Sequence, residues 1–286
     1  MNSGRGGVAR DDHALVTVRT FEHTFRQLSI RSGGVLLVHA SLSSLGFVLN
    51  GVETLRVALR RALGPEGTLL VPTFTGDLTD PACWVDPALP AAVWDEVRAA
   101  MPAFDRERTL PASMGQLAAS VLMDPASRRS EHPLCSFAAL GPRAEELVAD
   151  HDLRDPFGLQ SPLARARALD AQVLLVGVDQ RKNAALLHAH CMSDAPQVRR
   201  NKGPFLAEID GRREWITPLR LAECGEGFVR IEDDLVARGL VRVARAGDGL
   251  CRAMWMQPTV ALVQHLLRMS PEAVLCGRAS CRQCSG

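Results

Sequence analysis

The chain has 286 residues, of which 47% are hydrophobic, and this is enough apolar material for a sizeable core. Its formal net charge of +1 argues against general binding to nucleic acid or to a membrane surface. The apolar runs are far shorter than the roughly 18 residues of a membrane span, and the polar N-terminus does not resemble a signal peptide. We therefore expect a cytoplasmic protein whose eight cysteines stay reduced.

Strands and helices alternate in the first half of the chain. A short apolar run over residues 35–38, bounded by glycines, predicts a strand that is buried on both faces. The next segment has apolar residues at helical spacing, and Gly64-Pro65 ends that helix. A second buried strand is predicted over residues 68–71. A strand, a helix and a strand with short connections are typical of a parallel sheet.

The middle of the chain is less regular because prolines interrupt it. One helix is predicted near residues 93–101. Residues 171–179 form the clearest strand pattern of the chain, and Asn183 is placed to cap a helix that follows. That helix lies directly after the carboxyl end of a strand, where open α/β sheets bind their ligands.

The pattern changes after Pro196. Alternating residues around Asp210-Gly211 predict a hairpin, and a second hairpin is expected over residues 239–255, between helices at 228–238 and 259–267. We predict a single α/β (α+β) domain over residues 1–286, with a central mixed sheet, flanking helices and a smaller C-terminal antiparallel part. Residues 1–19 are expected to be disordered, and residues 270–286 form a cysteine-rich tail.

The stretch "KNAALLHAHCMSDAP" carries two histidines and a cysteine within four residues. On a helix, His188 shares a face with Cys191, whereas His190 points elsewhere, so the three do not bind one ion. Three interpretations remain open. His188 makes local polar contacts beside a buried Cys191, or it is a general base, or it activates Cys191 as a nucleophile.

Four stretches carry a family resemblance. They are "GGVLLVHASLSSLGFV", "ALGPEGTLLVPTFT", "RRSEHPLCSFAALGPRAEEL" and "GLQSPLARARALDAQVLLVGVD". In this order they resemble the aminoglycoside 3-N-acetyltransferases, over about residues 20–270. The resemblance implies the α/β fold of that family, an antibiotic N-acetyltransferase-like fold, and acetyl-CoA as the acetyl donor.

The resemblance also implies a catalytic base. In the family, a Leu-His-Leu-Ala-Glu helix supplies a histidine that deprotonates the attacking amine and a glutamate that orients this histidine. His188, preceded by Leu187, matches the histidine, and the glutamate position falls on Cys191. A protonated thiol brings no negative charge to stabilise an imidazolium. His190 replaces the carboxylate only if the helix register shifts, and Asp179 or Glu223 are other candidates to orient His188.

By the same likeness, the turn after the first strand lines the CoA groove. Its hydroxyls are suited to donate hydrogen bonds to the thioester oxyanion and to the cofactor. The residues expected at the groove are His39, Ser41, Ser43, Thr73 and Phe74. His132, which precedes a proline, is expected to make structural hydrogen bonds.

The acceptor predicted by the resemblance is a small-molecule amine. Aminoglycosides are polycations, and Asp77, Asp80 and Glu223 are the acids expected to bind one. However, the stretch "ITPLRLAECGEGF" has few acids for an acceptor loop. An aminoglycoside is therefore the leading prediction, and a less cationic natural-product amine is kept beside it. A Cys191–His188 thiol enzyme and a non-catalytic CoA binder are the alternative functions.

The cysteine-rich tail predicts a metal site. Structural zinc takes four sulfur or nitrogen ligands in a tetrahedron. The tail offers three cysteines, and the "AECGEGF" turn offers a fourth. The predicted ligands are Cys224, Cys276, Cys281 and Cys284. The alternative is a disordered tail with loose thiols.

Overall fold

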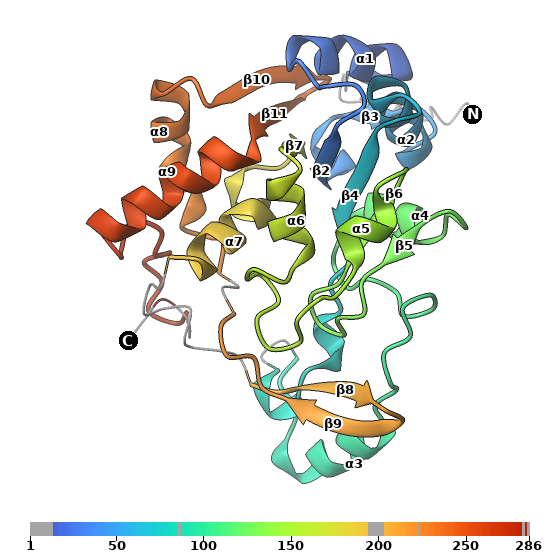
Figure 1. The fold of residues 1–286 in the computed structure, drawn as a ribbon, viewed down its shortest axis with the longest axis vertical. Coiled ribbons are helices and arrows are strands. Elements are labelled where there is room, and N and C mark those ends of the chain that lie inside the picture. Colours follow the sequence, from blue (N-terminus) through green and yellow to red (C-terminus); the bar gives the residue numbers. More distant parts are fainter. Residues whose placement is uncertain (1–13, 85–86, 194–202, 222–223, 282–283, 285–286) are drawn as a thin grey trace, which may run out of the picture.

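The computed structural model describes residues 14–84, 87–193, 203–221, 224–281 and 284. A seven-stranded mixed sheet with the strand order β10-β11-β7-β2-β4-β6-β5 lies at its centre (Figure 1). The three central strands run parallel: β2 (Val35–Ala40), β4 (Thr68–Pro72) and β7 (Gln172–Val176). Antiparallel pairs extend the sheet on both sides: β5 (Arg128–Arg129), β6 (Phe137–Leu140), β10 (Val241–Ala246) and β11 (Gly249–Trp255).

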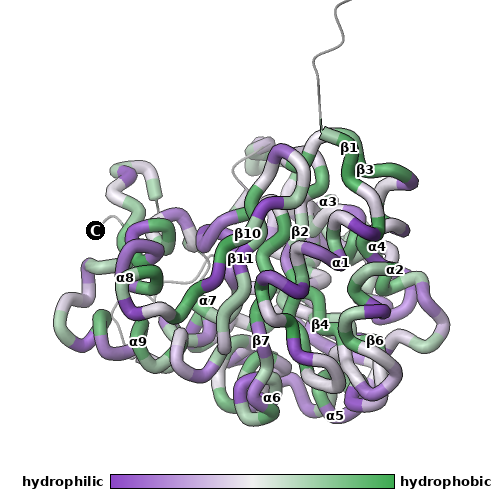
Figure 2. Tube along the Cα trace, turned by 90° about the horizontal axis from the view of Figure 1, so that it is seen from above, coloured by the Kyte–Doolittle hydropathy of each residue, from purple (hydrophilic) through white to green (hydrophobic). Residues whose placement is uncertain are grey.

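Both faces of the sheet are buried, because successive side chains of a strand point to opposite faces. Leu36 and Val38 of β2 belong to one hydrophobic core, and Val35 and Leu37 belong to the other. The first core is covered by α1 (Val18–Gln27), α2 (Val52–Leu63) and α4 (Gly115–Leu122). The second is covered by α5 (Ala144–Val148), α6 (Pro162–Ala168), α7 (Ala184–Cys191) and α9 (Met256–Met269). Figure 2 shows hydrophobic stretches along the central strands between these helices.

Several predicted elements are confirmed. The helix after β2 ends at Gly64, whose φ of 67° is in the left-handed region that favours glycine. The helix expected near residues 93–101 is α3 (Trp94–Ala100). The side chain of Asn183 accepts a hydrogen bond from the backbone N–H of Ala185 at 3.0 Å, so it caps α7 as expected.

The predicted central mixed sheet and smaller antiparallel part are confirmed, and the two predicted hairpins are divided between them. The hairpin β10–β11 pairs with β7 and thereby joins the central sheet. The small separate sheet is formed instead by β8 (Phe205–Ile209) and β9 (Arg212–Ile216). Figure 1 shows this pair beside α3, at the end of the molecule away from the central sheet. Arg213 connects the two segments, because its Nη2 donates to the carbonyl of Met101 at 2.7 Å.

The N-terminal segment is more ordered than expected. Residues 1–13 lie outside the described part of the chain, but residues 14–19, which were also predicted to be disordered, are described. Strand β1 (Leu15–Val16) pairs with β3 (Phe47–Val48), and Thr17 caps α1. Near the other end, α8 (Glu232–Ala237) follows a short 3₁₀ turn. Among the described residues, no helix combines the length and the apolar character needed to cross a membrane.

Gly177 allows the loop after β2 to lie against the end of β7. Its φ is +64°, its N–H donates to the carbonyl of Leu250 at 2.9 Å, and its carbonyl accepts from the hydroxyl of Ser44 at 2.7 Å. A Cβ atom at this position would overlap the carbonyl oxygen of Ser41 and the Ser44 hydroxyl. Only glycine therefore fits here without displacing the loop.

We expect Gly177→Ala to lower the free energy of unfolding by about 2–4 kcal/mol, since it combines left-handed strain with steric overlap. Gly211→Ala is the matched control, because Gly211 also has a positive φ of 74° but no neighbouring atom within 4 Å of the place that a Cβ would take. Urea unfolding measures both variants. Equal losses of stability would show that the overlap at Gly177 is relieved at no cost.

Candidate active site

A cavity of about 770 Å³ lies at the carboxyl ends of the central parallel strands. Ligands of open α/β sheets bind at this edge. Its walls come from three segments: the ends of β2 and β4 with their loops, residues 113–118 at the start of α4, and residues 178–187 around the start of α7. Figure 1 shows that β2, β4 and β7 lie side by side, and two of the three wall segments come from the carboxyl ends of these strands.

Four of the five predicted groove residues lie on the cavity wall. They are His39, Ser41, Ser43 and Phe74. The hydroxyls of Ser41 and Ser43 lie 3.0 Å apart and share a hydrogen bond. Their contact with CoA stays a prediction, but their position in the cavity agrees with it.

Thr73 is the exception. It is fully buried, its hydroxyl lies 3.0 Å from that of Ser136, and it accepts a hydrogen bond from Nε of Arg129 at 3.1 Å. Thr73 does not line the cavity itself, because its side chain is turned into this polar cluster, and its place beside the CoA groove stays a prediction. The Arg129 guanidinium also donates to the carbonyls of Thr73 (2.8 Å) and Thr109 (2.6 Å), and burial lowers the pKa of Arg129 to about 10. A charged group thus ties the strand end to the irregular middle segment.

His39 joins the loop after β2 to α7. Its Nε2 accepts a hydrogen bond from the backbone N–H of Ala184, the first residue of α7, at 3.2 Å. Burial first, and the nearby Lys182 ammonium second, lower the pKa of His39 to about 3. The ring is therefore neutral, and the lone pair of Nε2 is occupied. His39 therefore positions α7, and its Nε2 lone pair is not available to accept a proton from a substrate.

His188 does not lie on the cavity wall, where a base was expected. The residue is 1% exposed, and its Nδ1 lies 2.6 Å from the carbonyl oxygen of Phe157. Since a carbonyl only accepts, Nδ1 carries the proton and Nε2 carries the lone pair. Burial is the main cause that lowers the pKa of His188 to about 4. Leu187, the preceding residue, lines the cavity instead. The role of His188 as base stays a prediction.

The other residues predicted around His188 have different surroundings. Cys191 is fully buried in the hydrophobic core beneath α7, which argues against a nucleophile that must meet a thioester. Asp179 binds Arg181, with Oδ2 and Nη2 2.6 Å apart. His190 is also buried, and its ring lies edge-on to Phe228 with 6.2 Å between the centroids.

The two predicted acceptor acids that the structure describes, Asp77 and Asp80, lie off the cavity wall. Asp77 is exposed in a 3₁₀ turn, and Glu223 lies outside the described residues. Asp80 forms two hydrogen bonds of 2.9 Å to Arg98, and these bonds are the main cause that lowers the pKa of Asp80. Neither Asp77 nor Asp80 lines the cavity.

His132 has the structural role that was predicted. Its Nδ1 accepts the backbone N–H groups of Leu134 and Cys135, each at 3.1 Å. It thereby holds the turn before β6.

Two parts of the wall were missed by sequence reasoning. One is the start of α4, where Met114 and Gln116 line the cavity. No pattern marks that segment, which follows the irregular middle of the chain. The other is the cation pair Arg181 and Lys182. The available signal was their position between the clearest predicted strand and the helix cap Asn183.

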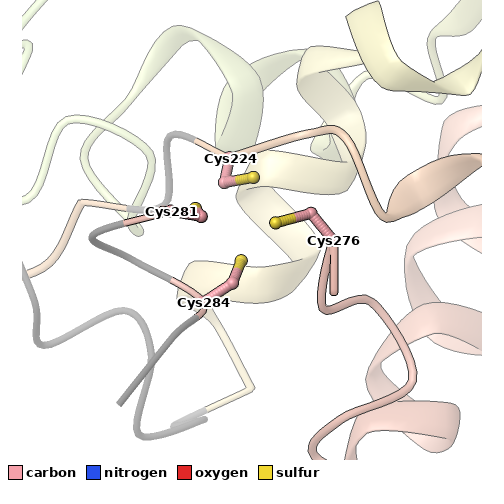
Figure 3. A group of neighbouring side chains, drawn as sticks. All are labelled: Cys224, Cys276, Cys281 and Cys284. Carbon is pink, nitrogen blue, oxygen red and sulfur yellow. The ribbon is translucent and has the colours of Figure 1, made fainter. Parts of the chain in front are cut away.

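The four predicted zinc ligands are brought together. The sulfur atoms of Cys224, Cys276, Cys281 and Cys284 all lie within 4.8 Å of one another (Figure 3). Sulfur ligands of a tetrahedral zinc ion are about 3.8 Å apart, given Zn–S bonds of about 2.3 Å, so the cluster fits this metal. The cluster joins the segment after β9 to the segment after α9. Burial is the main cause that raises the pKa of Cys284 to about 11, so a thiolate set needs a cation there.

The fold and cavity define an α/β protein with a ligand site at the edge of its sheet. Residues 37–268 match the family model for aminoglycoside 3-N-acetyltransferase. The chain therefore belongs to this family.

Individual relatives agree with this assignment. Aminoglycoside N(3)-acetyltransferase IX of Micromonospora chalcea is 32% identical over 248 residues, which cover 81% of this chain and 86% of the relative. The structure of AAC-IIIb with CoASH matches with a TM-score of 0.75 and 26% identity, and covers 90% of this chain and 97% of that one. A histidine-to-alanine mutant of AAC(3)-IVa with a bound gentamicin has a TM-score of 0.79 and 28% identity, and covers 97% of both chains.

Buried imidazoles predict that acid destabilises the fold. Burial is the main cause that lowers the pKa of His39 to about 3 and the pKa values of His151 and His188 to about 4, from 6.5. Below about pH 6.5 the unfolded chain takes up protons that the folded chain does not. The free energy of unfolding should therefore fall from about pH 6.5 to about pH 4, by about 1.4 kcal/mol per pH unit for each such imidazole.

Urea unfolding at a series of pH values measures this slope. His151 is the residue to replace, since its two ring nitrogens bond to Ser130 Oγ and to the carbonyl of Pro156 and do not line the cavity. His151→Gln should reduce the dependence of the free energy of unfolding on pH by the contribution of one imidazole, about 1.4 kcal/mol per pH unit. An unchanged slope would mean that this imidazole titrates equally in both states.

Proposed function

We propose that this protein transfers an acetyl group from acetyl-CoA to an amine of a small molecule, an aminoglycoside or a related natural product. The family match over residues 37–268 carries this proposal. The cavity at the strand ends supports it, because the predicted CoA-groove residues His39, Ser41 and Ser43 lie on its wall. One related structure contains CoASH and another contains a gentamicin.

The chemistry is the attack of a neutral amine on the thioester carbonyl. A C–N bond forms, the C–S bond breaks, the CoA thiolate takes up a proton, and the amine nitrogen loses one. The hydroxyls of Ser41 and Ser43 are proposed to donate to the oxygen of the tetrahedral intermediate. His188 is proposed to accept the amine proton. Its support is the hydrogen bond to Phe157, which fixes the tautomer with a lone pair on Nε2.

We also propose a cytoplasmic location, in which the cysteines stay reduced. Two cellular roles fit the reaction: resistance to an aminoglycoside and a step in natural-product biosynthesis. Inactivation of an antibiotic and modification of a biosynthetic intermediate use the same acetyl transfer. The identity of the acceptor therefore decides between the two roles.

The direct test is thiol release from acetyl-CoA in the presence of a panel of amines. We expect His188→Gln to lower kcat by about 10²–10⁴-fold, the usual contribution of a positioned base. Cys191→Ser is the control, and it should retain turnover because Cys191 is buried away from the cavity. Full activity of His188→Gln would remove His188 as the base. Binding of CoA without turnover of any amine would favour the non-catalytic binder.

For the cysteine cluster we propose a structural zinc ion. Four sulfur ligands leave no open position, so such a site stabilises a fold and takes no part in catalysis. The bound ion would hold the tail after α9 against the segment that carries Cys224. Beside the cluster, Arg278 and Glu226 form an ion pair of 2.8 Å between the same two segments.

Metal analysis of the purified protein should find about one zinc ion per chain. Cys276→Ser and Cys281→Ser should each lose the metal and lower Tm, because one ligand is removed from a four-ligand site. Cys83→Ser is the matched control, since Cys83 is also a half-buried cysteine but lies outside the cluster. Parent protein without zinc, together with unchanged Tm in both variants, would contradict the site.

A further inference from the structure

A backbone carbonyl orients the ring of His188. Nδ1 of this ring lies 2.6 Å from the carbonyl oxygen of Phe157. Cys191 stands where the family resemblance expects the orienting glutamate, and Asp179, another candidate, is paired with Arg181. The two nitrogens belong to one rigid ring, so the direction of the lone pair on Nε2 depends on the place of the Phe157 carbonyl.

This carbonyl belongs to a tight turn over residues 155–158. The sequence Asp-Pro-Phe-Gly is typical of a type I turn, which favours aspartate first, proline second and glycine fourth. The N–H of Gly158 donates to the carbonyl of Asp155 at 2.9 Å and closes the turn. Phe157 is 1% exposed, and its ring centroid lies 5.7 Å from that of Phe74. The third residue of the turn is thus anchored in the core.

The neighbouring carbonyls of the turn are also bound by side chains. Nε2 of His151 donates to the carbonyl of Pro156 at 2.8 Å. The hydroxyl of Ser161, which caps α6, donates to the carbonyl of Gly158 at 2.6 Å. Together with the bond to Nδ1, three successive carbonyls accept from three separate parts of the chain. The orientation of the turn is therefore fixed relative to all three.

The carboxylate of Asp155 lies against the turn itself. A Cβ atom added at Gly158 would lie 2.1 Å from Oδ2 of this carboxylate. The same oxygen accepts a hydrogen bond from Nη2 of Arg220 at 2.5 Å, and the Asp155 side chain is 15% exposed. Leu219, next to Arg220, donates its N–H to the carbonyl of Arg154 at 2.7 Å. A charge-assisted bond and a backbone bond thus hold the segment after β9 against the turn.

We propose that Asp155 is a positioning residue for the catalytic base. Bound by Arg220, it holds the turn so that the Phe157 carbonyl accepts the Nδ1 proton of His188 and the Nε2 lone pair is left for the acceptor amine. The turn thereby takes the place of the glutamate that the resemblance puts at position 191. Asp155 does not line the cavity, so it acts through the turn. This inference rests on the proposed role of His188 in acetyl transfer.

The tautomer of His188 gives the direct test. Nitrogen-15 NMR distinguishes the two tautomers of each histidine ring, and the signals lost in His188→Gln assign this one. The parent should show the Nδ1–H tautomer with slow exchange of its proton. Asp155→Ala should populate the Nε2–H tautomer and speed that exchange by about tenfold, because the carbonyl is no longer held in place. The parent's tautomer and exchange rate in Asp155→Ala would overturn the inference.

Two variants separate positioning from a general loss of stability. Asp124→Ala is the matched control, because the Asp124 carboxylate is 24% exposed and also binds one arginine, Arg56, at 2.7 Å. It should lower Tm as Asp155→Ala does and leave the His188 signals unchanged. Asp155→Asn keeps an acceptor for Arg220 and suits the first position of the turn. It should restore the Nδ1–H tautomer.

Turnover gives a second readout. Asp155→Ala should lower kcat by about tenfold and change the KM for acetyl-CoA by less than about twofold, since Asp155 lies off the cavity wall. Asp155→Asn should keep kcat within about threefold of the parent. A rise in the KM for acetyl-CoA with kcat unchanged would contradict positioning of the base.

The NMR comparison separates this inference from the proposed function. If His188→Gln keeps full activity, the proposed base is wrong, and the tautomer alone decides whether Asp155 positions the ring. If Asp155→Ala does not fold, Arg220→Gln takes its place, because it removes the charged partner and keeps the turn sequence. An unchanged exchange rate of the Nδ1 proton in Arg220→Gln would then overturn the inference.

Discussion

The site depends on the hydrogen bond between the backbone N–H of Ala184 and Nε2 of His39. The first N–H groups of a helix have no partner within the helix, and here a side chain from the neighbouring parallel strand supplies one. The bond requires a neutral His39, and burial keeps the ring neutral. It fixes the start of α7 relative to the serine turn after β2, and so it positions Lys182 and Leu187 on the cavity wall.

Other buried polar groups hold the remaining irregular segments in the same way. His188 binds the carbonyl of Phe157, and Arg129 binds the carbonyls of Thr73 and Thr109. These carbonyls lie outside regular helices, and side chains supply hydrogen bonds to them. Burial makes each bond expensive to lose, because an unpaired polar group in the interior costs about 1–3 kcal/mol. Imidazoles at such positions contribute to stability whether or not they take part in catalysis.

Local sequence patterns predicted the strands and helices well, but they did not predict which strands pair with one another over long sequence distances. The apolar runs of β2, β4 and β7 and the turn at Asp210-Gly211 are properties of short segments. Which hairpin joins the central sheet depends on the partner β7, which is far from β11 in the sequence, and no local pattern encodes it. The four clustered cysteines were found because cysteine spacing limits the choices. The contact of Thr73 with Arg129 was not foreseen, because Arg129 comes from a distant segment.

The match of His188 to a family motif does not determine which way its side chain points from α7. A step of one residue turns a side chain by about 100° around a helix, so Leu187 and His188 have different surroundings although they are adjacent. The histidine consequently occupies a buried position, where protonation is disfavoured.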